Sequence, residues 1–337
     1  MKKIVWCVIG AGGIADRRGI PALLSDPHNE VAAVMDRVVD VAETVAKKYH
    51  IPAFYGDAEE MLKSTKFDAV YIASPVFCHY EQAMLALKYG VNVFMEKPLA
   101  MNAKEGKQIV DAFIEAGKQL TVGYMMGYHN LHRQARQLIA DGKLGTVNLV
   151  RMQFSCWYPE IPGAWRQNPA LSGGGCIMDL AVHCMELFGS ITGDEIADCQ
   201  AYYGTRTFRY PVEDSAVIMF RSKQGVLGHI DVNFNIPDAC ATSRLEIYGT
   251  EGSICAEGTL GQEEVGNMSY VYSPQGSYDA QQSRSVAQSQ TFAAEGANIY
   301  QKQFAYFNSL IAEGKTCYDN ALTALHIQQL CDRIYEG

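Results

Sequence analysis

Three features that identify other classes of protein are absent from this sequence. It has no run of 18 apolar residues, so we expect no membrane-spanning helix and no membrane partner. Its 28 Lys and Arg residues are outnumbered by 37 Asp and Glu residues, and the resulting net charge of −9 argues against a nucleic-acid partner. Its ten cysteines form no C-x-x-C pair, and scattered thiols in a long chain are typical of a reduced cytoplasmic protein rather than of a disulfide framework.

The chain does have the length and apolar content of a two-domain globular protein. Its 337 residues are 48% hydrophobic and 19% charged, which allows a sizeable core and argues against global disorder. The first residues, MKKIVWCVIGAGG, share two lysines and an apolar run with secretory signal peptides. That run is short and leads straight into a glycine turn, so it predicts a first β-strand instead.

A glycine-rich turn follows this first strand. Residues 3–9 form the predicted strand, G-x-G-x-x-A follows at residues 10–15, and a helical pattern comes next. Gly10 permits a tight turn, Gly12 lets a pyrophosphate approach the backbone, and Ala15 keeps the helix close to the strand. The free N–H groups and the positive dipole end at a helix N-terminus bind phosphates. The expected phosphate-binding residues are therefore Gly10, Gly12, Gly13, Ile14 and Ala15.

An acidic residue ends the second predicted strand. Residues 31–35 are apolar, and Asp36 follows 21 positions after Ala15 (36 − 15). In dinucleotide-binding folds an acidic residue about twenty positions on binds the adenosine ribose. Asp36 favours NAD over NADP, because its charge would repel a 2′-phosphate. Arg37 leaves NADP open, because it could stack on adenine or pair with a phosphate.

Strands and helices alternate over the first 125 residues. This alternation predicts a doubly wound parallel sheet, a Rossmann domain, over residues 1–125. Strands then dominate, which predicts an α+β domain with a large, mainly antiparallel sheet over residues 126–337. The polar segment 258–294 is expected to be irregular, and the C-terminal helices, about 298–312 and 320–335, can pack back on the first domain. The other predicted helices are 39–49, 58–62, 77–89, 103–116 and 132–140, and the other predicted strands are 68–73, 91–95, 120–124, 147–157, 196–203, 215–220, 226–234 and 244–248.

A lysine follows the predicted strand 91–95. That strand ends in Glu96, Lys97 and Pro98, and the chain must turn there because proline cannot continue a central strand. Asn102 then caps a new helix, with Glu105 as its reciprocal partner and Ile109, Val110, Phe113 and Ile114 as its apolar stripe. Lys97 is thus expected at the carboxyl end of a parallel strand, where ligands bind in open α/β sheets. An ordinary solvated lysine in a loop is the alternative.

A glycine run opens a helix in the middle of the second half. Gly173, Gly174 and Gly175 precede an apolar stripe that consists of Ile177, Leu180, Cys184 and Leu187. A second stripe consists of Cys176, Asp179, His183 and Glu186. Asp179 and His183 are four residues apart and share one side, and a carboxylate beside an imidazole suits acid–base chemistry at neutral pH. A salt-bridged aspartate with a buried histidine is the alternative; a metal site is disfavoured, because Cys176, Asp179 and His183 have no evident fourth ligand.

Together these motifs resemble the Gfo/Idh/MocA family of oxidoreductases, named for glucose–fructose oxidoreductase and inositol dehydrogenase. The similarity covers nearly the whole chain. The motifs that carry it are the glycine turn, residues 73–75 with His79, residues 96–98, residues 123–124, residues 165–166, the glycine run leading to Asp179 and His183, residues 212–214 and residues 248–252.

The resemblance implies an NAD- or NADP-dependent enzyme that acts on a sugar, cyclitol or related polyol. Lys97 and His183 match positions that bind and deprotonate the reacting hydroxyl, and Asp179 matches a supporting carboxylate. Gly127 and Asn130 stand where many members carry an arginine and a proline, so that arginine's contacts cannot be carried over. The other cofactor contacts expected are Arg37, Ser74, Pro75, His79, Glu96 and Lys97, and the other substrate contacts expected are Lys97, Tyr124, Trp165 and Arg166.

Three readings of the function remain open at this point. The leading one is a dehydrogenase that passes a hydride between a carbinol carbon and nicotinamide, without a metal. The second is a lyase or glycosidase that retains NAD and oxidises its substrate transiently. The third is a non-catalytic sugar-sensing regulator, against which the intact Lys97, Asp179 and His183 argue. We also expect a homodimer or homotetramer, because the second half has too few helices to cover both faces of its sheet.

Overall fold

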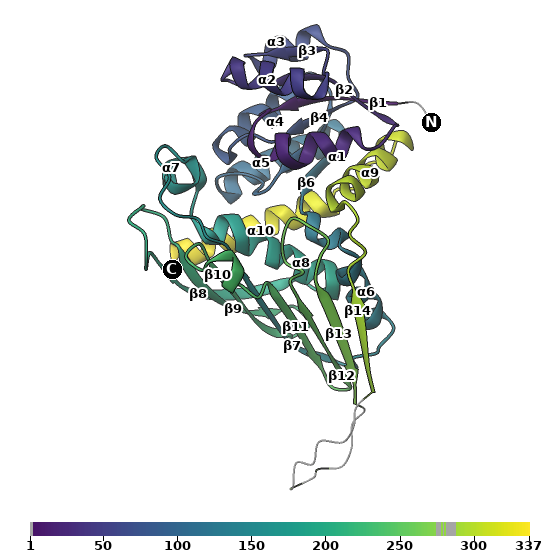
Figure 1. The fold of residues 1–337 in the computed structure, drawn as a ribbon, viewed down its shortest axis with the longest axis vertical. Helices are drawn as coiled ribbons and strands as arrows, with labels where there is room; N and C mark the ends of the chain where they lie inside the picture. Colours follow the sequence, from purple (N-terminus) through teal and green to yellow (C-terminus); the bar gives the residue numbers. More distant parts are fainter. Residues whose placement is uncertain (1–2, 274–277, 279, 281–287) are drawn as a thin grey trace. The chain divides into compact units, whose positions relative to one another are not determined.

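The computed structural model describes residues 3–273, 278, 280 and 288–337 (Figure 1). The chain forms two compact units. The first consists of residues 1–124, 164–173 and 300–333, and the second of residues 125–163, 174–299 and 334–337. A short segment from the middle of the chain and most of the two C-terminal helices therefore belong to the same unit as the N-terminal residues.

The first unit is built on a six-stranded parallel sheet with the strand order β3-β2-β1-β4-β5-β6. The strands are β1 (Ile4–Ile9), β2 (Asn29–Met35), β3 (Ala53–Tyr55), β4 (Ala69–Ile72), β5 (Asn92–Glu96) and β6 (Leu120–Gly123). This order confirms the predicted doubly wound sheet; only the short strand β3 was not predicted. The strand order reverses between β1 and β4, so the segments that follow these two strands turn to opposite faces of the sheet, and ligands of such folds bind at this point.

Most helices of this unit begin and end close to where the sequence predicted, whereas those at residues 165–167 and 169–172 were not predicted. They are the π-helical turn η1 (Ala15–Gly19) with α1 (Ile20–Leu24), α2 (Val39–Tyr49), α3 (Ala58–Ser64), the 3₁₀ turn η2 (Val76–Cys78) with α4 (His79–Lys88), α5 (Ala103–Ala116), the 3₁₀ turn η4 (Trp165–Gln167), α7 (Pro169–Ser172), α9 (Ile299–Ala312) and α10 (Asp319–Glu336). Capping explains the start of α5, since Asn102 Oδ1 accepts a hydrogen bond from Glu105 N–H at 3.0 Å. The reciprocal bond to Glu105 comes from Met101 N–H rather than from Asn102.

The apolar stripe predicted for α5 is wrong at one position. Ile109, Val110 and Phe113 are buried, but Ile114 is 42% exposed. At about 100° per residue, Ile114 lies about 140° around the helix from Ile109 and so falls outside the buried face.

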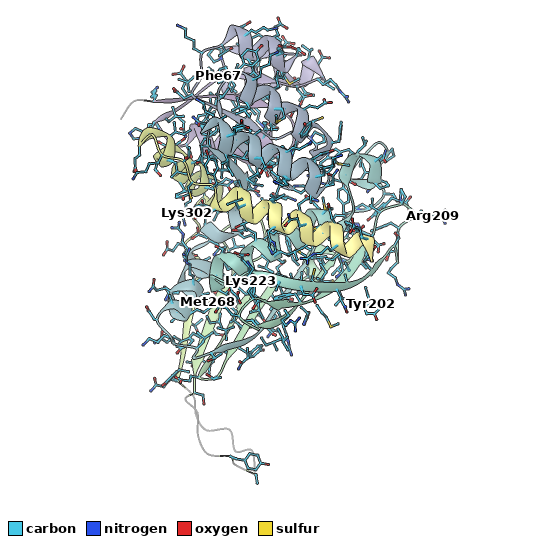
Figure 2. The ribbon with its side chains drawn as sticks, turned by 180° about the vertical axis from the view of Figure 1, so that it is seen from behind. Phe67, Tyr202, Arg209, Lys223, Met268 and Lys302 are labelled. Atoms are coloured by element: carbon cyan, nitrogen blue, oxygen red, sulfur yellow. The ribbon has the colours of Figure 1, made fainter. Side chains whose placement is uncertain are left out.

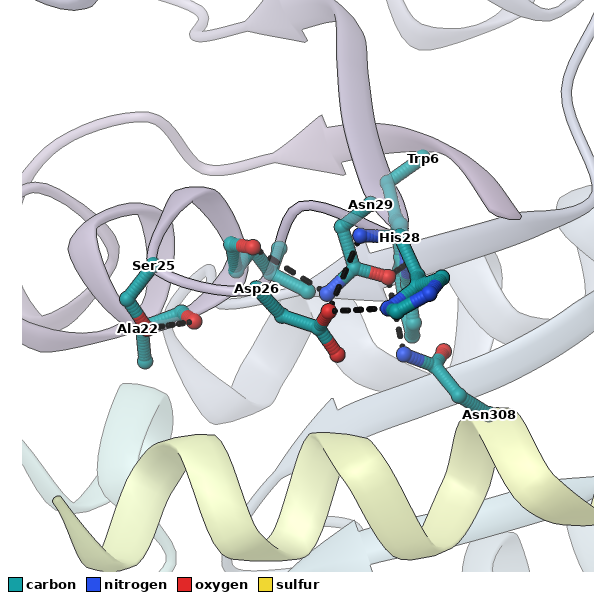
Figure 3. Close-up of polar contacts among 8 residues, drawn as sticks. Trp6, Ala22, Ser25, Asp26, His28, Asn29 and Asn308 are labelled. Carbon is teal, nitrogen blue, oxygen red and sulfur yellow. Dashed lines mark hydrogen bonds and ion pairs between the residues drawn. The ribbon is translucent and has the colours of Figure 1, made fainter. Parts of the chain in front are cut away.

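Helix α9 completes the core of the first unit. Phe304 and Phe307 pack against Trp6, with ring centroids 5.6 and 5.2 Å away. Figure 3 shows the polar anchor beside this cluster, in which Asn308 and Trp6 both donate hydrogen bonds to Asn29 Oδ1 at 2.8 and 3.2 Å. Because Trp6 and Asn29 belong to β1 and β2, these contacts fix helix α9 to the central strands of the unit.

The second unit is built on an eight-stranded sheet with the strand order β14-β13-β12-β11-β7-β10-β9-β8. The strands are β7 (Val147–Ser155), β8 (Ile196–Gly204), β9 (Ser215–Ser222), β10 (Leu227–Asn233), β11 (Arg244–Gly249), β12 (Gly252–Glu257), β13 (Asn267–Tyr272) and β14 (Gln288–Ala293). Every neighbouring pair is antiparallel except β7 and β10. The predicted large, mainly antiparallel sheet is confirmed.

The prediction of an irregular segment at residues 258–294 is wrong for its two strands. In β13, Met268 and Tyr270 are buried and alternate with more exposed residues, while β14 forms the edge of the sheet and exposes most of its polar side chains. A polar strand of this kind has no apolar pattern by which a sequence could reveal it. Residues 274–277, 279 and 281–287 of the same segment lie outside the described residues.

Helices cover one face of this second sheet. They are the 3₁₀ turn η3 (Met125–Tyr128), α6 (Asn130–Ala140), the π-helical turn η5 (Ile177–Ala181) and α8 (Val182–Thr192), and a further 3₁₀ turn, η6, spans Asp238–Cys240. Residues 169–192 are long and apolar enough to span a membrane by length and composition alone, but 78% of that window is buried inside the protein. Burial of that extent is typical of the core helix of a globular protein.

The opposite face of the sheet exposes apolar side chains. Tyr202 of β8 is 84% exposed, and Figure 2 shows its ring projecting from the strand. Val217 and Met219 of β9 and Leu227 of β10 are 47%, 56% and 56% exposed. Tyr202 and Val217 are direct neighbours in the sheet, so these side chains form one continuous surface, which we call the open face.

Candidate active site

The glycine turn after β1 lies against the ends of two neighbouring strands. Gly10 has a φ of +86°, and a Cβ atom there would lie 2.6 Å from Ser74 N, at the end of β4. Asp36, after β2, accepts hydrogen bonds from Gly12 N–H at 3.4 Å and from Val38 N–H at 3.0 Å. The structure therefore brings the predicted phosphate turn and the predicted ribose-binding carboxylate together.

The other residues predicted to bind phosphate lie on the same turn. Gly13 has a φ of +56°, and Ala15 N–H donates to Gly12 O at 3.2 Å as the helical turn η1 begins. Ala15 is fully buried, as its predicted role in keeping the helix close to the strand requires. Ile14 stands immediately before η1. Arg37 lies beside Asp36 and is near enough for its charge to act on the Cys78 thiol, whose pKa is raised by burial.

His79 connects the loops that follow β4 and β5. Its Nδ1 lies 2.9 Å from Pro98 O and its Nε2 lies 3.0 Å from Ser74 O. Burial lowers the pKa of His79 to about 4, and the positive charge of Lys97 acts in the same direction. A neutral imidazole carries one N–H, so one of the two contacts is a hydrogen bond. His79 is 1% exposed, and the structure shows it holding these loops together beside Pro75.

Lys97 directly follows a buried carboxyl group at the end of β5. Glu96 Oε1 accepts a hydrogen bond from Tyr71 O–H at 2.6 Å. Burial raises the pKa of Glu96, while the Tyr71 hydrogen bond and the positive charges of Lys97 and Arg166 oppose that shift. Since the Glu96 side chain is buried, a contact between this residue and a cofactor would have to come from its main chain. The peptide bond between Lys97 and Pro98 is cis.

The charge of Arg166 acts on Glu96 although the two residues are far apart in sequence. Arg166 and Trp165 belong to the segment 164–173, which is part of the first unit. The Arg166 guanidinium lies 4.3 Å from the centre of the Trp165 ring. Tyr124, which ends the first segment of this unit, is 2% exposed. The first unit therefore holds Lys97, Tyr124, Trp165 and Arg166 of the predicted substrate contacts.

Sequence reasoning missed Tyr71, which sets the environment of Glu96. A tyrosine in an otherwise apolar strand is a usable signal, because a buried hydroxyl group needs a hydrogen-bond partner. Tyr300 of α9 was missed as well; its pKa is raised by burial and by the charge of Glu96. No signal in the sequence relates residue 300 to residue 96.

Asp179 and His183 lie on adjoining helical turns of the second unit. The predicted helix begins as the π-helical turn η5, which holds Asp179, and continues as α8, which holds His183. Two residues four apart differ by about 40° in an α-helix and by about 30° in the opposite sense in a π-helix, so both geometries keep these side chains on one side. His183 is 5% exposed, and the Phe154 ring lies edge-on to it at 6.4 Å.

The rest of this helix is more deeply buried than its two stripes predicted. The predicted apolar stripe is buried throughout, as Ile177, Leu180, Cys184 and Leu187 show. Cys176 is also fully buried, and burial together with the charges of Glu213, Asp214 and Asp179 raises its pKa. A thiol held protonated in this way is a poor metal ligand. No group of three metal-binding side chains occurs among the residues that the structure describes.

Gly127 packs closely against the same helix. A Cβ atom there would lie 2.8 Å from Ser190 Oγ and 3.7 Å from Glu186 Oε1. Asn130 begins helix α6 directly after η3. The absence of a long side chain at Gly127 therefore allows η3 to approach α8, and a larger residue would push Ser190 aside.

Two family models match the chain over most of its length. The model described as "Oxidoreductase family, NAD-binding Rossmann fold" matches residues 4–124, and the model described as "GFO/IDH/MocA C-terminal domain" matches residues 132–255. Among curated proteins, 1,5-anhydro-D-fructose reductase from Ensifer adhaerens is 27% identical over 307 residues, which cover 91% of this chain and 87% of that protein. D-xylose 1-dehydrogenase (NADP(+)) 2 from Haloferax volcanii is 26% identical over 334 residues, which cover 99% and 97%.

Solved structures share the whole fold. An oxidoreductase domain protein from Kribbella flavida has a TM-score of 0.87 and 23% identity, with 100% of this chain and 97% of that chain covered. A levoglucosan dehydrogenase solved with NADH and levoglucosan has a TM-score of 0.86 and 20% identity, with 99% and 97% covered. At these identities the structural likeness establishes the fold alone.

Proposed function

Because the chain belongs to the Gfo/Idh/MocA family of oxidoreductases, we propose that it is an NAD(P)-dependent dehydrogenase that moves a hydride between nicotinamide and a secondary hydroxyl or ketone of a sugar, cyclitol or glycoside. The observation that carries this proposal is the placement of Lys97 beside Glu96 at the carboxyl end of β5. Ligands of doubly wound sheets bind at that edge. The Asp179–His183 pair supplies an acid–base group on the second unit.

Lys97 and His183 divide the work on the reacting hydroxyl. The Lys97 ammonium donates a hydrogen bond to the substrate oxygen and stabilises the negative charge that develops on it. The His183 imidazole takes the proton, since histidine is the side chain that changes charge near neutral pH. Asp179 orients His183 or binds a neighbouring substrate hydroxyl. The cofactor supplies the hydride acceptor when it is bound.

The glycine turn and Asp36 support binding of NAD in preference to NADP. Gly10, Gly12, Gly13, Ile14 and Ala15 form the phosphate turn, and the Asp36 carboxylate lies at its side. A carboxylate accepts hydrogen bonds from a free ribose 2′-hydroxyl and repels a 2′-phosphate. Residues 1–125 are therefore proposed as the cofactor domain and residues 126–337 as the substrate and assembly domain.

The open face of the second sheet supports assembly into a homodimer or homotetramer. Tyr202, Val217, Met219 and Leu227 are large apolar side chains on adjacent strands, and such surfaces mark interfaces. Met219→Glu should yield a monomer in sedimentation, while Ile114→Glu, on an exposed side of α5, should leave the oligomer intact. A wild-type protein that sediments as a monomer at micromolar concentration would refute this assignment.

The cysteines support a reducing compartment such as the cytoplasm. All ten lie among the described residues, and none forms a disulfide bond there. Cytoplasmic proteins keep their cysteines reduced, whereas secreted domains pair them. The net charge of −9 argues against a nucleic-acid partner, and the proposed partners are a small polyol or sugar and a second copy of the chain.

The test of the proposed function is a screen for reduction of NAD and NADP with product analysis. Panels should include D-xylose, levoglucosan, inositols and glucosides, and the reverse reaction should be tested with 1,5-anhydro-D-fructose. We expect NADH in a one-to-one ratio to oxidised product. Turnover of a glycoside without released NADH would instead identify an enzyme that retains its cofactor, and binding of sugars without turnover would identify a sensor.

A further inference from the structure

A buried carboxylate holds the start of the helical segment that carries Asp179 and His183. Both oxygens of Glu213 lie 2.9 Å from Gly175 N–H, and Oε1 also accepts a hydrogen bond from Ile177 N–H at 3.0 Å. Tyr335, near the end of the chain, donates its hydroxyl hydrogen to the same Oε1 at 2.8 Å. Glu213 is 6% exposed. We call Glu213, Tyr335 and the amides of Gly175 and Ile177 the helix clamp.

The glycine run before this segment leaves space for the clamp. A Cβ atom at Gly174 would collide with the Tyr335 hydroxyl group, and one at Gly175 would collide with Glu213 O. Cys176 N–H also donates to Glu213 O, at 3.1 Å. Two of the three glycines are therefore explained by close approach of Glu213 and Tyr335, a role different from the flexibility that a glycine run usually indicates.

The hydrogen bonds described for the Glu213 carboxyl group come from the N–H groups of Gly175 and Ile177 and from the hydroxyl group of Tyr335, which are all donors. Burial raises the pKa of Glu213, and the hydrogen bonds from Ile177, Tyr335 and Gly175 oppose that shift. A carboxylate that only accepts hydrogen bonds is satisfied as an anion, and an anion at the N-terminal end of a helix is stabilised by the helix dipole. Loss of one of these donors leaves part of a buried charge unsatisfied, which is costly.

The clamp acts on Asp179 through one residue. Gly175 gives its N–H to Glu213 and accepts the Asp179 N–H through its carbonyl group at 3.1 Å. The hydrogen-bonded path from the end of the chain to the candidate site is therefore Tyr335, Glu213, Gly175 and Asp179. The π-helical turn that holds Asp179 begins at Ile177, the second amide that Glu213 holds.

Asp214, the next residue, holds a different part of the second unit. Its carboxylate accepts hydrogen bonds from the N–H groups of Arg206, Thr207 and Phe208 at 2.8, 2.8 and 3.0 Å. Burial acts to raise the pKa of Asp214, but these hydrogen bonds outweigh it and the pKa is lowered. Because the Asp214 carboxylate binds the N–H groups of residues 206–208, the carboxylate that binds the start of the helical segment is that of Glu213.

We propose that Glu213 and Tyr335 are positioning residues of the dehydrogenase site, which hold the π-helical turn 177–181 in the geometry that Asp179 and His183 need for proton transfer. Neither residue is proposed to touch the substrate or the cofactor. The inference rests on the proposed function, since it assigns the proton transfer to His183. It extends that function by placing control of the site at Glu213 and Tyr335, which follow His183 by 30 residues (213 − 183) and 152 residues (335 − 183) in the chain.

The decisive variant is Tyr335→Phe, with Thr259→Val as its matched control. Tyr335→Phe removes only the hydroxyl group that bonds to Glu213. Thr259→Val removes a buried hydroxyl group of the same unit, one that lies 3.1 Å from His132 Nε2 and outside the clamp. Each change is nearly isosteric and deletes one hydrogen bond, so both variants should lose some stability.

Two measurements separate positioning from stability. In Tyr335→Phe we expect kcat to fall about 10-fold with the KM for NAD unchanged, because small displacements of reacting groups are costly. We expect the amides of residues 177–181 to exchange with deuterium about 10-fold faster, since one hydrogen bond to a charged group is lost. Thr259→Val should change kcat less than 2-fold and leave exchange at residues 177–181 as in the wild type. Glu213→Gln should enlarge both effects of Tyr335→Phe.

Other outcomes overturn the proposal. Unchanged exchange at residues 177–181 in Tyr335→Phe, or faster exchange without a fall in kcat, would show that the clamp does not position the site. Equal losses of kcat in Tyr335→Phe and Thr259→Val would assign the effect to stability. If no sugar or polyol reduced NAD in the wild type, the proposed function would fail, while the exchange measurement would still decide whether the clamp holds this turn.

Discussion

The Asp36 carboxylate accepts a hydrogen bond from the Gly12 N–H at 3.4 Å, and the same side chain accepts one from Val38 N–H at 3.0 Å. The residue that is expected to determine the preference for NAD over NADP is therefore hydrogen-bonded directly to the phosphate turn. Its charge and its hydrogen bonds can be separated by substitution.

Asp36→Asn should shift cofactor preference towards NADP. The amide oxygen can keep the bond to Val38 N–H, while the charge that repels a 2′-phosphate is lost. We expect the ratio of kcat/KM for NADP to that for NAD to rise about 10-fold or more. Steady-state kinetics with both cofactors measure it, and a wild-type enzyme that already prefers NADP would contradict the role given to Asp36.

Lys97→Met and His183→Ala should each lower kcat by about 10²-fold or more, the usual scale for acid–base groups. Affinity for NAD, measured by fluorescence titration, should change little, because neither residue lies at the phosphate turn. A chelator should leave the wild-type rate unchanged. Near-normal kcat in His183→Ala would move the proton transfer to Lys97.

The contribution of His132 to the stability of the second unit should fall in acid. This residue is fully buried, its Nδ1 lies 2.8 Å from Met126 O, and its pKa is lowered from 6.5 to about 3 by burial and by the neighbouring His129. In the unfolded chain His132 therefore binds a proton below about pH 6.5, whereas in the folded chain it does so only below about pH 3. The free energy of unfolding that His132 contributes therefore falls as the pH drops through that window. Linkage gives a loss of about 2 kcal/mol between pH 7 and pH 5 from this group.

Urea unfolding of the wild type and of His132→Gln at both pH values measures this contribution. The variant is expected to be less stable at pH 7 but to lose about 2 kcal/mol less on acidification. An equal loss in both proteins would show that His132 does not control the acid sensitivity.

Alkali should destabilise the same unit through Glu186. Burial raises the pKa of this carboxyl group from 4.5 to about 8, and its Oε2 has no hydrogen-bond partner among the described atoms. The folded protein keeps the proton between about pH 4.5 and pH 8 while the unfolded chain releases it, so the cost grows with pH across this window. Linkage sets the cost at about 3 kcal/mol at pH 7.

Glu186→Gln removes that ionisation and keeps the shape of the neutral acid. We expect the variant to unfold at higher urea than the wild type at pH 8 and at similar urea near pH 4.5. A gain that does not depend on pH would indicate that packing, rather than ionisation, separates the two proteins.

Local patterns in the sequence predicted most elements of the first unit. Helices α2 (Val39–Tyr49) and α5 (Ala103–Ala116) match their predicted bounds because periodicity and caps both mark them. The strands β12, β13 and β14 were missed; β14, at the edge of the sheet, is polar and so has no apolar pattern to mark it. Asp179 and His183, by contrast, are four residues apart, so helix geometry alone predicted that their side chains lie on the same side of the helix.

The contacts that arrange the candidate site could not be predicted, because they join distant parts of the chain. The Glu213–Tyr335 hydrogen bond spans 122 residues, and the charge of Arg166 reaches Glu96 from a segment with no pattern of its own. A single sequence does not show which distant residues come into contact. Each partner is a common polar residue, and only the folded structure makes the two neighbours.

The packing of Phe304 and Phe307 on Trp6 has a consequence for how the protein is made. The ribosome releases the chain from its N-terminus, and domains generally fold as units during synthesis. The first unit includes residues 300–333. Trp6 of its strand β1 therefore cannot pack against Phe304 and Phe307 until nearly the whole chain has been translated. Most of the second unit precedes residue 300, but its helix clamp is complete only when Tyr335 has been translated. A nascent chain stalled before residue 300 would leave Trp6 accessible to chaperones.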